Sequence, residues 1–167
     1  MSKVDKEILK ITSSIDKNCE NKNWQCMHPF CQETSINSHL LQRNGILNTI
    51  TENGHLIEIK PNDFFKIEKD GLMKYKRVGI NESLSQPLFC NKHDSEIFKL
   101  IETYPIKFND YKIQLLFSYR SLCGELRKKH KALEKHKRIL SSHIIQSRCS
   151  SEYTHITVNA IKENEIA

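Results

Sequence analysis

Four side chains in two short pairs are the residues of this sequence best suited to chemistry. Cys26 and Cys31 flank a turn-forming segment that contains Pro29, and two thiols at this Cys-x4-Cys spacing can chelate one ion. Cys90 and His93 form a Cys-x2-His pair at the predicted start of a helix, where both side chains can converge on one point. Three thiolates and one imidazole form a tetrahedral set typical of zinc, with Zn–S near ~2.3 Å and Zn–N near ~2.0 Å. The spacing therefore predicts one structural Zn2+.

Other residues offer alternative interpretations of this site. His28 lies inside the first pair and could replace a thiol, Cys19 precedes the pair, and His39 could be the fourth ligand in place of His93. The simplest competing interpretation is a set of ordinary buried thiols, because free cysteine buries well. Two pairs at chelating spacing favour the metal site. A thiol-based enzyme is disfavoured because nothing in the sequence marks an oxyanion site.

The composition indicates a polar but folded chain in a reducing compartment. Of the 167 residues, 38% are hydrophobic and 28% are charged, which excludes a disordered polyelectrolyte. No segment reaches the ~18 apolar residues of a membrane span, and the N-terminus lacks the uncharged apolar core of a signal peptide. We therefore predict a cytoplasmic protein without membrane contact, in which metal binding by cysteine is a better default than disulfide formation.

Hydrophobic periodicity places these residues in a mixed α+β fold. Helical spacing predicts helices over residues 3–17, 91–103 and 109–146. Alternation predicts strands over residues 55–60 and 153–161, with a hairpin joining residues 63–69 to 72–78 around Gly71. Asn37 or Ser38 is predicted to cap a helix running through residue 50, whereas residues 18–37 and 79–88 are predicted loops.

These elements suggest two domains and several partners. We expect a zinc-binding domain over residues 1–108, and a long basic helix with a terminal strand over residues 109–167 that suggests continuation into a longer protein. Residues 127–138, RKKHKALEKHKR, carry seven lysines and arginines against Glu134 alone. Such a run predicts contact with nucleic acid phosphates, the alternative being a solvated helix face. The long helix could also bind a protein partner or form a homodimer.

The order of these motifs resembles a known family. A Cys pair, then a His, then a hairpin, then a Cys-x2-His pair that opens a helix resembles the treble-clef zinc finger of the HNH (ββα-metal) endonucleases, over Cys26 to Ile101. The resemblance implies a small antiparallel hairpin and helix around the zinc, with the two pairs as its ligands. The segments S-H-L-L-Q and F-C-N-K-H-D also resemble an uncharacterised group of bacterial proteins, some associated with defence against phage.

The resemblance implies roles for further residues. His39 stands where the family keeps its general base, and Asp94 stands near the helix ligand of a catalytic Mg2+ or Mn2+. The orienting asparagine of the family could be any of Asn44, Asn48 and Asn53. One departure is Ser38, where the family has an acid or histidine, because serine is a poor ligand for a hard cation. Either Asp94 with another acid such as Glu33 completes a nuclease site, or the chain is a non-catalytic zinc module that binds nucleic acid or protein.

Overall fold

The fold is α+β, as predicted, in a computed structural model that describes residues 3–62, 70–103, 105–148 and 151–165. The chain forms two compact units. Unit 2 comprises residues 25–122 and contains both strand pairs, whereas unit 1 comprises residues 1–24 and 123–167 and is helical. The expected division into 1–108 and 109–167 stays a prediction.

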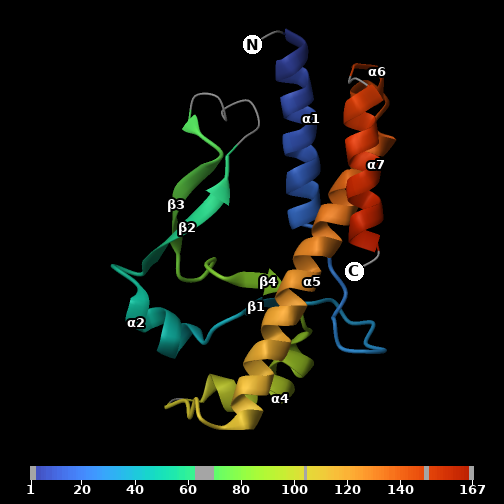
Figure 1. Cartoon of the computed structure of the whole chain (residues 1–167). Helices are drawn as coiled ribbons and strands as arrows, with labels where there is room; N and C mark the ends of the chain where they lie inside the picture. The colour runs from blue at the N-terminus through green and yellow to red at the C-terminus, as the bar shows by residue number, and fades with distance from the viewer. Residues whose placement is uncertain (1–2, 63–69, 104, 149–150, 166–167) are drawn as a thin grey trace. The chain divides into compact units, whose positions relative to one another are not determined.

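Two short sheets form the β part of unit 2. Strands β1 (Asn37–His39) and β4 (Ser85–Pro87) pair antiparallel, with Ser38 opposite Gln86. Strands β2 (His55–Pro61) and β3 (Met73–Gly79) form a longer antiparallel ribbon. Figure 1 shows this ribbon extending away from β1 and β4. The predicted strand over residues 55–60 and the small antiparallel sheet are confirmed, while the predicted partner strand 63–69 lies outside the described residues.

The helix predicted from Asn37 or Ser38 is wrong for its first part. Residues 37–39 are strand β1, and only a π-helical turn η1 (Arg43–Leu47) and a short α2 (Asn48–Ile50) are helical. Ser38 caps no helix, because it lies inside strand β1 opposite Gln86, and its side chain is buried. Residues 79–88, predicted as loop, contain β4. Strands of three residues are too short to show a period, so pairing with a distant segment decides them.

Helix α4 (Asn91–Glu102) and the first part of α5 (Tyr111–Ser141) complete unit 2. The predicted helix over residues 91–103 is therefore confirmed. Phe89 and Phe98 are fully buried, with ring centroids 5.0 Å apart, and the ring of Tyr119 from α5 lies 5.9 Å from Phe89. This aromatic cluster is the core on which the start of α4 rests.

Unit 1 consists of α1 (Lys3–Glu20), the remainder of α5, α6 (His143–Arg148) and α7 (Ser151–Glu165). The helices predicted over residues 3–17 and 109–146 are confirmed, the second with an interruption at Ser142. The strand predicted over residues 153–161 is wrong, because these residues are helical. Thr154, Thr157 and Ile161 are three and four residues apart, which is helical spacing, and Thr157 is buried. Helix packing decides between the two periods here.

Candidate metal centre

The side chains of Cys26, Cys31, Cys90 and His93 lie together in unit 2, with their ligand atoms within 4.8 Å of one another. The Cys31 and Cys90 sulfurs are 3.9 Å apart, and Nδ1 of His93 lies 3.2 Å from the Cys90 sulfur and 3.5 Å from that of Cys26. A tetrahedral zinc site has S···S edges of ~3.8 Å and S···N edges of ~3.5 Å. The four side chains can therefore hold one metal ion, with Nδ1 as the imidazole ligand.

A short reversed segment, the knuckle (residues 25–34), positions the first cysteine pair. Gln25 and Thr34 form an isolated antiparallel bridge, and the N–H of Cys26 donates to the carbonyl of Glu33 at 2.8 Å. Between them the N–H of Cys31 donates to the His28 carbonyl at 3.1 Å. The backbone N–H of His28 also points at the Cys26 sulfur, 3.5 Å away, where it would stabilise a thiolate.

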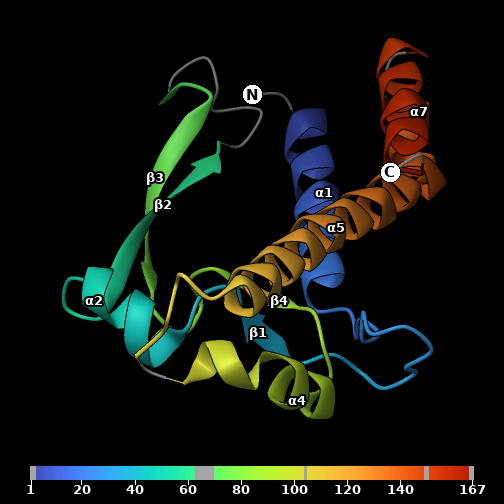
Figure 2. The ribbon, with the colours of Figure 1, turned by 60° about the horizontal axis from the view of Figure 1, so that its bottom comes forward.

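Backbone hydrogen bonds join the knuckle to the segment that opens α4. The N–H of Met27 donates to the Leu88 carbonyl and that of Ile36 to the Phe89 carbonyl, both at 2.8 Å. Figure 2 shows the loop before β1 beside the start of α4. Cys90 is the N-cap residue of α4, so its sulfur lies beside the free N–H groups of the first turn. These bonds bring together two ligand pairs that are distant in the sequence.

The two buried thiols of this cluster have opposite pKa shifts. The pKa of Cys90 is lowered, first by the backbone N–H of His93 and against the effect of burial. The pKa of Cys26 is raised, chiefly by burial, although backbone N–H groups of Cys90 and His28 oppose that effect. A metal cation would favour both thiolates, because it attracts their negative charge.

Two of the alternative ligands, His28 and Cys19, do not belong to the cluster. The ring of His28 stacks on that of His93, with centroids 3.8 Å apart and planes 9° from parallel, while its Nδ1 lies 3.0 Å from the Pro29 carbonyl. His28 therefore orients a ligand of the cluster without belonging to it. Cys19 is buried in unit 1, where its carbonyl accepts a hydrogen bond from Trp24.

His39 and Asp94 are outside the metal-binding cluster. Nε2 of His39 lies 3.1 Å from the carbonyl oxygen of Ile80. A carbonyl only accepts, so Nε2 carries the hydrogen and a neutral His39 presents its Nδ1 lone pair. Ser38 beside it is 1% exposed, and no donor or acceptor reaches its Oγ. This leaves Ser38 poorly placed to contact a hydrated cation.

Arg120 on α5 pairs with a predicted site residue, Asp94, and the sequence did not reveal this contact. It is 1% exposed, lies over the Phe98 ring at 4.3 Å, and donates to Asp94 at 3.2 Å and to Glu102 at 2.5 Å. The carboxylate expected to hold a catalytic cation is thus paired with a buried guanidinium. One sequence signal could have indicated its burial: Arg120 lies seven residues after the buried Ile113, so both residues fall on the same face of a helix.

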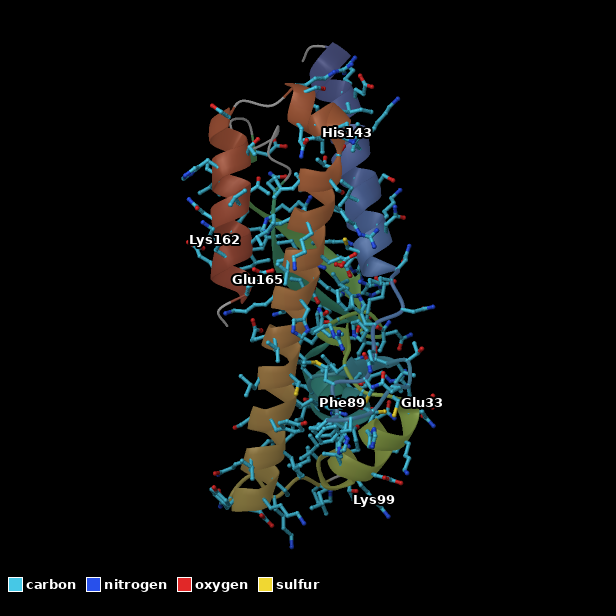
Figure 3. The ribbon with its side chains drawn as sticks, turned by 90° about the vertical axis from the view of Figure 1, so that its right-hand side faces the viewer. Glu33, Phe89, Lys99, His143, Lys162 and Glu165 are labelled. Carbon is cyan, nitrogen blue, oxygen red and sulfur yellow. The ribbon has the colours of Figure 1, made fainter. Side chains whose placement is uncertain are left out.

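The other candidate catalytic residues have the following surroundings, and their roles stay predictions. Asn44 accepts a hydrogen bond from the neighbouring Arg43, and Asn53 forms a turn with a φ of 50°. Asn48 is exposed in α2. Figure 3 shows Glu33 at the rim of the knuckle, where it is exposed. Among the described residues, the Cys3His set is the one group of three or more histidine, cysteine or acidic side chains close enough to share an ion.

The basic run of α5 is largely paired within unit 1. Its lysines reach acids on neighbouring helices: Lys131 pairs with Glu20 at 2.6 Å, and Lys135 pairs with Asp16 at 2.6 Å. Further pairs are Lys128–Glu125, Lys137–Glu165 and Arg138–Glu134. Arg127 is buried and lies 5.0 Å from the Trp24 ring centre. Among the described residues, acids of α1 and α7 therefore pair with three of the seven cations of this run, and two more cations pair with acids of α5 itself.

In the part of the chain that is described, no helix has the length and apolar character needed to cross a bilayer.

The four side chains of the cluster can cross-link the knuckle to α4 through a metal ion, and His39 offers one oriented imidazole outside that cluster. No family model matches the chain, and neither a curated protein nor a solved structure matches it significantly.

Proposed function

We propose that this chain is a zinc-stabilised binding module, in which one structural Zn2+ fixes the knuckle, the β1–β4 pair and α4 as a platform for a partner. The observation that carries the proposal is the convergence of four ligand atoms within 4.8 Å. Cys26, Cys31, Cys90 and His93 would hold the ion, which supplies a tetrahedral cross-link between segments far apart in the sequence. Four protein ligands would fill the tetrahedral shell of the ion and leave no open coordination position for catalysis.

The residues around the site support binding rather than cleavage. A nuclease of the HNH type needs a second cation held by hard oxygen ligands. The Asp94 carboxylate is paired with Arg120, and Ser38 is buried. The charge of Arg120 would oppose a divalent cation at Asp94 by Coulomb repulsion.

Metal analysis of the purified chain tests the zinc module. One zinc per chain is expected for the wild type, and less than one half for Cys90→Ala, because three remaining ligands bind structural zinc weakly. Cys123→Ala is the matched control, since Cys123 is equally buried but outside the cluster. Metal-free wild type, or equal zinc in both variants, would exclude this assignment.

A second candidate is a divalent-metal-dependent endonuclease of the HNH type, with defence against phage as the setting that the sequence resemblance suggests. The orientation of His39 favours it, because a neutral imidazole with a free Nδ1 can accept a proton from water. Purified protein with Mg2+ or Mn2+ should then nick plasmid DNA, and His39→Ala should abolish the nicking. His143→Ala on α6 is the control, since His143 is exposed and distant in sequence from the site. Equal activity of both variants would exclude His39 as the base.

A further inference from the structure

Cys31 is the most accessible of the three thiols in the candidate metal centre. Cys26 and Cys90 are 7% and 6% exposed, whereas Cys31 is half-buried. Its chain neighbour Phe30 is fully exposed and has a φ of 62°, a left-handed conformation that phenylalanine rarely adopts. A small reagent from solvent would therefore meet the sulfur of Cys31 before the other two.

A second thiol lies beside this sulfur. The Cys90 sulfur is 3.9 Å from that of Cys31. A disulfide bond is ~2.05 Å long, so an approach of about 2 Å is needed, which side chains released from a metal can supply. The backbones on either side are already joined, since the N–H of Ile36 donates to the carbonyl of Phe89 at 2.8 Å. The two thiols are thus placed for oxidation to a disulfide.

This disulfide would join the same two segments as the metal ion. Cys31 belongs to the knuckle and Cys90 is the N-cap residue of α4. A Cys31–Cys90 bond would therefore replace one cross-link by another, whereas a Cys26–Cys31 bond would close a loop inside the knuckle alone. Either bond leaves two ligands for the metal, and structural zinc needs four.

We propose that Cys31 and Cys90 form a peroxide-sensitive thiol site, at which oxidation to a disulfide releases the zinc and keeps the knuckle joined to α4. In the first step the Cys31 thiolate attacks one oxygen of hydrogen peroxide, the O–O bond breaks and hydroxide leaves, so that Cys31 becomes a sulfenic acid. In the second step the Cys90 thiolate attacks the Cys31 sulfur, the S–O bond breaks and a second hydroxide leaves. The two sulfurs together lose two electrons, and hydrogen peroxide gains them.

The proposal rests on the zinc module and adds its regulation by an oxidant. In the reducing compartment predicted from the cysteine content, cellular thiols would reduce the disulfide and allow zinc to return. Cys19 and Cys123 are buried in unit 1, outside the cluster. Buried thiols away from a metal react slowly, so the site should be selective.

The test treats the full zinc-loaded chain with hydrogen peroxide and follows zinc release with a colorimetric chelator, against a sample without peroxide. Mass spectrometry of alkylated, unreduced peptides then identifies the disulfide. The wild type is expected to release its zinc and to yield peptides linked through Cys31 and Cys90. A thiol reductant with added Zn2+ should reverse both changes.

Two histidine variants locate the reacting thiol. Cys31→His keeps a fourth ligand but removes the accessible thiol, so zinc release by peroxide is expected to be slower by about tenfold or more. Cys26→His is the matched control, because it makes the same exchange at a buried cysteine of the knuckle and leaves the reacting pair intact. Should either variant fail to load zinc, the linked peptides of the wild type decide alone.

The outcomes separate this site from the zinc module. Zinc retained by the loaded wild type under peroxide, a disulfide between any other two cysteines, or equal release by the two histidine variants would overturn the thiol site. A chain that holds no zinc before peroxide is added would overturn the module instead. Hydrogen exchange gives a further readout: the oxidised chain should keep more protection at the start of α4 than the reduced chain stripped of zinc by a chelator, and equal loss would contradict the retained cross-link.

Discussion

The two units of this chain are held by different interactions. In unit 2 the candidate metal centre joins the irregular knuckle to the start of α4, and strands β1 and β4, which follow and precede these segments in the sequence, are only three residues long. In unit 1 long helices carry ion pairs between their exposed side chains, such as Lys135–Asp16. Short elements gain little stability from their own local structure, so they depend on a strong cross-link. Long helices can instead be stabilised by packing. The comparison predicts that the units respond differently to the same perturbation.

Removing the metal should give the largest difference between the units. Structural zinc contributes on the order of 10 kcal/mol to a small fold. A strong chelator is therefore expected to abolish hydrogen-exchange protection in the knuckle and α4, while α1 and α7 keep theirs. Peptide-resolved exchange measured by mass spectrometry, before and after restoring Zn2+, checks this. Uniform loss across both units, or no loss in unit 2, would contradict it.

Replacing Arg120 should have the next largest effect. Arg120→Met keeps the apolar stem over Phe98 but leaves Asp94 and Glu102 without their buried counter-charge. A loss of about 3 kcal/mol is expected, at the lower end for a broken buried pair because both acids are partly exposed. Chemical denaturation of the zinc-loaded chain measures it. Arg43→Met is the control, because Arg43 is exposed, and an equal loss for both would show that Arg120 has no special role.

The sequence predicted the four residues of the candidate metal cluster better than the strands around them. Ligand spacing is a local property with strong chemical constraints, so Cys26, Cys31, Cys90 and His93 could be chosen from pattern alone. By contrast, β1 and β4 exist because Ser38 meets Gln86, a pairing that no window of sequence contains. In the same way Arg120 resembled a surface cation, because its two acidic partners belong to α4.

The basic run of α5 stays a predicted contact for nucleic acid, but part of its charge is paired within the chain. The run over residues 127–138 suggested a phosphate-binding helix, yet acids from α1 and α7 lie against several of its lysines. Alternation of apolar and charged residues predicts the strand over residues 55–60, but it does not predict which side of the strand is buried. Only the burial of each face shows that the apolar side points outward.

Weakening one ion pair of unit 1 should have a smaller effect than either change in unit 2. Lys135→Gln removes the partner of Asp16, and both side chains are largely exposed. A loss below about 1 kcal/mol is expected, since exposed pairs contribute little and salt screens them. Thermal unfolding in low and high salt measures it. A difference that persists unchanged at high salt would show that packing of the lysine stem, and not charge, is responsible.

Acidification should reveal the smallest contribution, that of Glu134. The hydrogen bond from Lys22 and then that from Arg138 hold the pKa of this carboxyl below its ordinary value of 4.5. A carboxyl with a lowered folded-state pKa stabilises the fold above its ordinary pKa, and this stabilisation is lost as the pH falls through the lowered value. Glu134→Gln should therefore be less stable than the wild type at neutral pH and should approach it below pH ~4. Unfolding followed by circular dichroism across this range checks the sign, with Glu125→Gln as the control, because Glu125 is more exposed and pairs with Lys128 alone among the described residues. A stability difference between wild type and Glu134→Gln that stays constant with pH would mean that shape, and not ionisation, explains the contribution of Glu134.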